Sequence, residues 1–72
     1  MMAELTLQKR IGRRVRLARQ RKGVTLEGMI RMGFHGSHIS RIESGETDVY
    51  VTTLLRIAGA LEVEPGELLN GL

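Results

Sequence analysis

The 72-residue sequence contains no cysteine and has a formal net charge of +3, from 11 basic and 8 acidic residues. The absence of cysteine excludes disulfides and thiolate metal sites, and no apolar run approaches the roughly 20 residues of a membrane span. We therefore expect one small domain over residues 1–72 in a cytoplasmic protein without a secretory signal.

The charges are distributed unevenly along the chain. Up to Ile42 there are ten basic and two acidic residues, whereas from Glu43 onward there are one basic and six acidic residues. A basic half that faces a polyanion and an acidic half that faces away from it fit a protein that binds nucleic acid. The alternative is that the Arg-rich helices are only solvated surfaces.

The first predicted helix spans residues 6–22. Its apolar residues recur at helical spacing and form one stripe: Leu7, Ile11, Val15 and Ala18. Gly12 inside this helix weakens it, and a close approach by another helix would explain the glycine. Gly23 is expected just past the end of the helix, where a left-handed residue is favoured.

Residues 25–45 predict a helix-turn-helix, which is two short helices joined by a tight turn. Thr25 caps the first of these helices, which is expected to end near Met32, and Gly33 then interrupts the helical pattern. This helix is unusually apolar, and its two methionines are predicted to fill the core; its apolar residues are Leu26, Met29, Ile30 and Met32. Phe34 after the turn is expected to be a buried anchor.

The second helix of the motif is predicted over residues 36–44, with Gly45 closing it. Its exposed face carries small polar groups and one Arg: Ser37, Ser40, Arg41 and Ser44. Such a face suits a helix that lies in the DNA major groove, because bulky side chains would block the approach to base edges.

His35 and His38 stand three residues apart, a spacing that metal ligands use on a helix. No Cys or carboxylate stands at a matching position, so we expect neither a metal site nor a cofactor. A contact with DNA phosphate is the functional use that we expect for His38, and a solvated His is the alternative.

The fourth helix is predicted over residues 51–61, and Pro65 suits the first position of a short last helix. The core stripe of the fourth helix is Leu54, Ile57, Ala58 and Leu61. Apolar residues near these helices exceed what one short helix can bury, and they form the predicted homodimer interface: Val49, Tyr50, Val51, Leu69 and Leu72. Five helices without a strand pattern predict a compact all-α domain.

Four blocks of the sequence resemble the Cro/repressor-type helix-turn-helix proteins of the Xre family. They are IGRRVRLARQRKG, HISRIESG, TLLRIAGALEV and EPGELLNG, and the resemblance extends from Ile11 to Gly71. In length the chain is similar to small phage repressors and to the controller proteins of restriction–modification systems. The resemblance implies a five-helix, lambda-repressor-like domain that binds operator DNA as a symmetric dimer.

The resemblance also implies roles for individual residues. Arg19 and Glu43 match an ion pair between the first helix and the end of the third. The base-reading positions fall on Gly36, Ser37, Ser40 and Arg41. Thr25 and His38 match positions of the family that contact phosphate, and we expect further phosphate contacts from Arg31, His35 and Arg19.

Three features depart from the family pattern. The stretch from Gly23 to Gly33 is one residue short, which changes how the two helices of the motif pack. Gly36 stands where a Gln or Arg often reads a base. The loop 46–48 contains Glu46 and Asp48 where relatives carry basic residues, and these carboxylates would repel phosphate.

The sequence thus predicts a sequence-specific transcriptional regulator that binds double-stranded DNA. The alternative is a protein-interaction module, of the antitoxin kind or another partner-binding kind, that retains the fold with weak or no specific DNA binding. The acidic loop, Gly36 and the apolar second helix favour that alternative. We do not expect an enzyme, because the sequence contains no nucleophile–base pair, paired carboxylates or phosphate-binding glycine loop.

Overall fold

The computed structural model describes residues 6–71, and all regular structure in that range is helical. The five helices are α1 (Leu7–Arg21), α2 (Leu26–Arg31), α3 (Gly36–Glu43), α4 (Val51–Leu61) and α5 (Pro65–Leu69). The predicted all-α fold is confirmed, and each predicted helix is present. None of the helices in the described range is both long and apolar enough to cross a membrane.

The helix ends follow the capping residues of the sequence. The hydroxyl of Thr6 accepts a hydrogen bond from the Lys9 N–H at 3.2 Å and caps α1. Gly23 then takes a positive φ of 70°, and the Val24 N–H donates to the Arg19 carbonyl oxygen at 3.0 Å. This pairing satisfies the last carbonyls of α1 and turns the chain toward α2.

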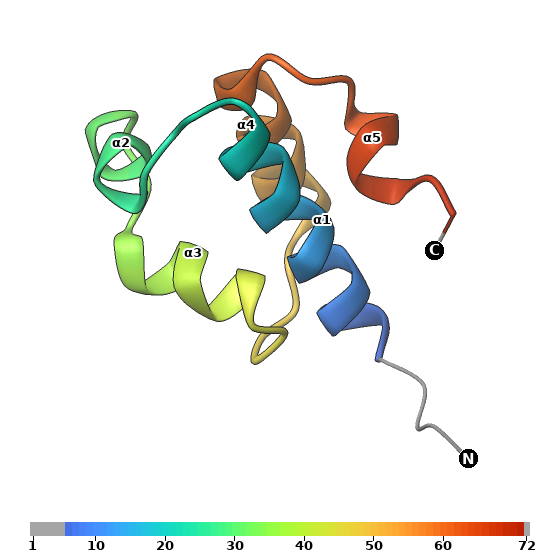
Figure 1. Ribbon diagram of the computed structural model, residues 1–72. Coiled ribbons are helices and arrows are strands. Elements are labelled where there is room, and N and C mark those ends of the chain that lie inside the picture. Colours follow the sequence, from blue (N-terminus) through green and yellow to red (C-terminus); the bar gives the residue numbers. More distant parts are fainter. Residues whose placement is uncertain (1–5, 72) are drawn as a thin grey trace.

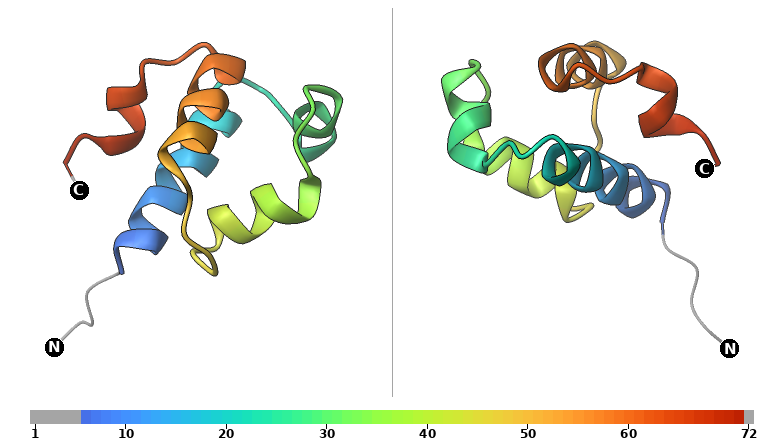
Figure 2. Two further views of the ribbon diagram at one scale, coloured as in Figure 1. Left: turned by 180° about the vertical axis from the view of Figure 1, so that it is seen from behind. Right: turned by 45° about the horizontal axis from the view of Figure 1, so that its top comes forward.

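α1 runs through the middle of the molecule (Figure 1). α2 and α3 lie on one side of it and α5 on the other, an arrangement also visible in both views of Figure 2. α1 packs against α3, α5 and α4, while α2 packs against α3. The buried apolar residues form one core: Val15, Ala18, Met29, Phe34, Ile39, Ile42, Leu54, Ile57, Ala58, Leu61 and Leu68.

Gly12 lies where α1 crosses the C-terminal end of α3. A Cβ atom at this position would stand 2.6 Å from the carbonyl oxygen of Glu43 and closer still to that of Ile42. The prediction that a close helix approach explains this glycine is confirmed.

One of the two methionines predicted to fill the core, Met32, is not in the core. Met32, which follows the last residue of α2, is 45% exposed and Ile30 is 50% exposed, whereas Met29 is fully buried. The physical reason is the length of α2, because a helix of six residues turns only one narrow side toward the core.

The apolar residues at the start of α4 differ in how far they are buried. Val49 is partly buried and packs against the core, whereas Tyr50 and Val51 are 79% and 70% exposed. Leu69 on α5 is also exposed, and Leu72 lies outside the described residues. Among the described residues of the predicted interface, Tyr50, Val51 and Leu69 are therefore the ones that expose apolar surface.

Candidate nucleic-acid interface

α3 has two chemically distinct faces. Ile39 and Ile42 are buried in the core, whereas Ser37, Ser40, Arg41 and Ser44 are exposed on the opposite side, and His38 is exposed beside the buried side. Among the described residues Arg41 forms no ion pair, so its guanidinium is available to a ligand. This face offers hydroxyls and one bidentate donor at the surface.

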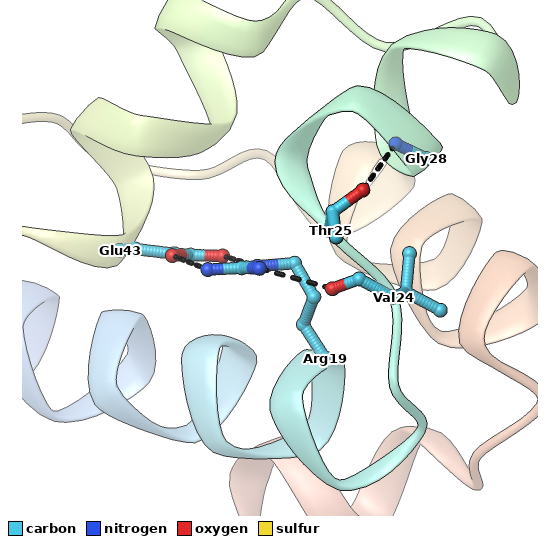
Figure 3. A network of polar contacts seen from close by, with 5 residues as sticks. All are labelled: Arg19, Val24, Thr25, Gly28 and Glu43. Carbon is cyan, nitrogen blue, oxygen red and sulfur yellow. Dashed lines mark hydrogen bonds and ion pairs between the residues drawn. The ribbon is translucent and has the colours of Figure 1, made fainter.

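A bidentate ion pair holds the end of α3 against α1 (Figure 3). Arg19 donates from Nε to Glu43 Oε2 at 2.7 Å and from Nη2 to Glu43 Oε1 at 3.0 Å. Both side chains are largely buried, with 12% and 8% of their surface exposed. The hydrogen bonds that Arg19 donates to Glu43 raise the pKa of Arg19 above its usual value, although burial opposes this shift.

The same guanidinium also holds the segment that leads into α2. Arg19 Nη1 donates to the carbonyl oxygen of Val24 at 3.0 Å, one residue before Thr25 (Figure 3). Arg19 thus links α1, the start of α2 and the end of α3. Three of its five N–H donors are directed to these partners, so its role within the fold is structural, and a contact of Arg19 with phosphate remains only a prediction.

Thr25 lies at the exposed start of α2. Its Oγ1 accepts a hydrogen bond from the Gly28 N–H at 3.0 Å, as Figure 3 shows. The hydroxyl proton remains able to donate to a further acceptor. Arg31 at the other end of α2 is 80% exposed and lies 3.8 Å from Glu27, a distance at which an exposed pair binds weakly.

His35 and His38 are both exposed near the start of α3. His35 is the N-terminal capping residue of α3, but its side chain makes no capping hydrogen bond. Within residues 6–71 no group of three His, Cys, Asp or Glu side chains is placed to hold a metal ion.

Gly36 differs from the other predicted base-reading residues because it is packed against α2. A Cβ atom at Gly36 would lie 2.9 Å from Cδ1 of Ile30. Ile30 therefore lies over Gly36, and α3 has no side chain with which to read a base at that point.

The acidic loop after α3 is tied to its neighbours by hydrogen bonds. Ser44 Oγ donates to Glu46 Oε2 at 2.6 Å, and Gln8 Nε2 donates to Asp48 Oδ1 at 2.7 Å. Asp48 is therefore held toward the start of α1, whereas Glu46 stays beside the end of α3.

Apart from Arg19, the basic residues of α1 are not distinguished from one another by the sequence analysis. In the structure Lys9, Arg13 and Arg16 lie beside Ser44 at the end of α3. Their separation by four and then three residues places them on one side of a helix, and this spacing is the signal that would have singled them out. Leu55, one helical turn after Val51, was also missed as an exposed apolar residue.

Comparison with known proteins agrees with this geometry. The model of a family described as a helix-turn-helix domain matches residues 10–72. The restriction–modification controller protein C.AhdI from Aeromonas hydrophila has a similar structure, with a TM-score of 0.79 and 32% sequence identity. The match covers 85% of this chain and 94% of that protein. No curated protein sequence matches the chain.

Proposed function

We propose a function from one premise: the chain belongs to the helix-turn-helix domain family and is a DNA-binding protein of the Cro/repressor type. It regulates transcription by binding a palindromic operator as a homodimer, with α3 in the major groove of each half-site. The proposal rests on one observation: α3 has an exposed polar face, and its C-terminal end is fixed against α1 by an ion pair. Arg41 is open to solvent on that face, while Arg19 and Glu43 hold the end of α3.

Base recognition is assigned to three side chains of α3. Arg41 forms a bidentate contact with guanine O6 and N7, a geometry that its planar guanidinium matches. Ser37 and Ser40 are short enough to let the helix approach and form hydrogen bonds with neighbouring base edges. Gly36 is omitted because it is packed against Ile30.

Phosphate contacts surround this face and set its orientation on the duplex. They are assigned to Thr25, Arg31, His35 and His38, all of which are exposed. Thr25 acts through its hydroxyl proton at the start of α2, where the helix dipole also favours an anion.

Dimerisation is assigned to the apolar surface at the start of α4 and the end of α5. Tyr50, Val51, Leu55 and Leu69 are exposed apolar or aromatic side chains in this part of the molecule. A 72-residue domain gains little stability from its own core, so burial of this surface in a dimer would stabilise the fold as well. Val49 supports the interface from the core side rather than lining it.

The similarity to C.AhdI, whose name describes a restriction–modification controller protein, favours a controller-type regulator over other small repressors. A protein of this kind is expected to recognise a site in the DNA upstream of the genes that it regulates. The family and the fold are those of regulatory DNA-binding proteins rather than of enzymes.

The test is selection of duplexes from a random-sequence pool, followed by fluorescence anisotropy on the enriched duplex and on a scrambled duplex. We expect a two-fold symmetric motif with half-sites about one helical turn apart. Preference for that duplex should persist at two salt concentrations while the absolute affinity falls with salt. Failure to enrich any motif, together with no binding at low salt, would reject this function.

A second function is favoured by one observation. Ile30 on α2 and Met32 just after it expose apolar surface, although α2 is expected to lie near the DNA. Such side chains suit a protein-interaction module in which a partner protein covers α2. The same binding experiment separates the two functions, because the interaction module binds neither duplex selectively.

A further inference from the structure

A groove lies between α1 and the C-terminal end of α3, outside the residues assigned above to base reading. It encloses about 350 Å³ and is lined by Lys9, Arg13, Arg16, Glu43 and Ser44. Three of these five residues are cations, and all three belong to one side of α1.

The electrostatic balance of the groove is positive. The carboxylate of Glu43 is neutralised by the bidentate contact with Arg19 and is 8% exposed. Among residues 6–71, none of the three cations of the groove forms an ion pair within 4.0 Å. Apart from Glu43, Glu46 is held beside the groove by its hydrogen bond with Ser44, and this one carboxylate does not balance three cations.

The groove is continuous with the exposed face of α3. Ser44 follows Ser40 and Ser37 at intervals of four and three residues, so the three hydroxyls lie on the same side of α3. Because Ser44 also lines the groove, a duplex that lies along this side of α3 reaches the cations at its C-terminal end.

We propose that Lys9, Arg13 and Arg16 form a binding site for DNA phosphates at the end of α3. The inference rests on the proposed DNA-binding function and adds α1 to the contact surface. Guanidinium groups suit phosphodiester oxygens because they donate two parallel hydrogen bonds. The site contacts the backbone alone, so it contributes affinity and register without sequence preference.

The first test compares two variants that remove the same charge from the same helix. Arg13→Gln/Arg16→Gln removes two cations of the groove, and Arg10→Gln/Arg21→Gln removes two cations from another side of α1. We expect the groove variant to bind the selected duplex and the scrambled duplex more weakly by the same factor. The slope of log affinity against log salt should fall by about one for each phosphate that is no longer neutralised, or about two per protomer. The control variant should retain the wild-type slope.

A second test locates the contact on the DNA. Single methylphosphonate linkages, which carry no charge, are placed one at a time along the selected duplex. At the phosphates that face the groove, neutralisation should weaken wild-type binding and leave binding by Arg13→Gln/Arg16→Gln unchanged. Such non-additivity marks a direct contact rather than a general effect of charge. Circular dichroism of both variants checks that α1 is still folded.

The outcomes separate this inference from the function on which it rests. Equal salt slopes for the groove and control variants, with wild-type selectivity intact, would overturn the phosphate site and leave the regulator proposal standing. Loss of selectivity in the groove variant would show that α1 reads bases, which also overturns a backbone-only site. Absence of wild-type binding to any duplex would overturn both.

Discussion

The main chain of Gly12 lies against the carbonyl of Glu43, so that α1 and the end of α3 touch through their backbones. We expect Gly12→Ala to destabilise the fold by about 1–3 kcal/mol, because the added methyl meets main-chain atoms that no side-chain rotation can move. Urea denaturation followed by circular dichroism at fixed protein concentration measures this change.

Gly59→Ala is the matched control for that substitution. Gly59 lies inside α4, and a Cβ atom there meets nothing within 4 Å. The same chemical change should therefore stabilise the fold by up to about 1 kcal/mol through helix propensity. If both substitutions changed the free energy of unfolding in the same direction, the close contact between α1 and α3 would not explain the effect at Gly12.

Removal of one partner of the Arg19–Glu43 pair should be more costly than removal of both. Arg19→Met leaves a largely buried carboxylate without its cation, and we expect a loss of about 3 kcal/mol. Arg19→Met with Glu43→Leu should recover a large part of that loss. A double-mutant cycle in urea checks the coupling, and simple addition of the two single losses would argue against it.

Arg41→Ala should reduce selectivity and leave stability unchanged. The side chain is exposed and forms no ion pair within the described range. Removal of a bidentate contact with guanine weakens discrimination of that base pair by about 1–3 kcal/mol. Anisotropy on the selected duplex and on duplexes with single substitutions measures the effect. Arg21→Ala, an exposed cation of α1, should retain the full selectivity.

Val51→Asp should convert a dimer into a folded monomer. Val51 is 70% exposed, so the charge is tolerated in a single chain but would be desolvated in the interface. Sedimentation equilibrium at micromolar concentration should give the 8.0 kDa chain for this variant and twice that mass for the wild type. Leu17→Asp introduces the same charge on α1 and should leave the wild-type mass unchanged. A monomeric wild type would reject the interface.

Glu46→Gln should raise the affinity for DNA of any sequence. The substitution removes a negative charge beside the end of α3, and the amide oxygen can still accept a hydrogen bond from Ser44. The gain should be largest at low salt, because screening weakens the repulsion that it relieves. Anisotropy with the selected and the scrambled duplex tests this, and Glu62→Gln at the end of α4 is the control. A gain confined to the selected duplex would contradict repulsion of the backbone.

Local signals in the sequence were sufficient to predict the fold. α4 has the predicted bounds, and α1 begins after Thr6 and ends before Lys22, because capping hydroxyls and glycines determine where helices begin and end. The two faces of α3 also follow from spacing alone, since Ile39 and Ile42 fall on one side of the helix and the serines on the other.

The sequence by itself thus determined the helices, their order and the polar face of α3, because these depend on residues close together in the chain. Only the tertiary structure decided which apolar residues stay exposed and which cations meet Ser44. Ile30 is exposed, Val49 packs against the core, and Gly36 is covered by Ile30, because the way in which the helices pack on one another sets each of these environments. The groove beside α1 has the same origin, since Arg13 and Ser44 come together only where α1 crosses α3.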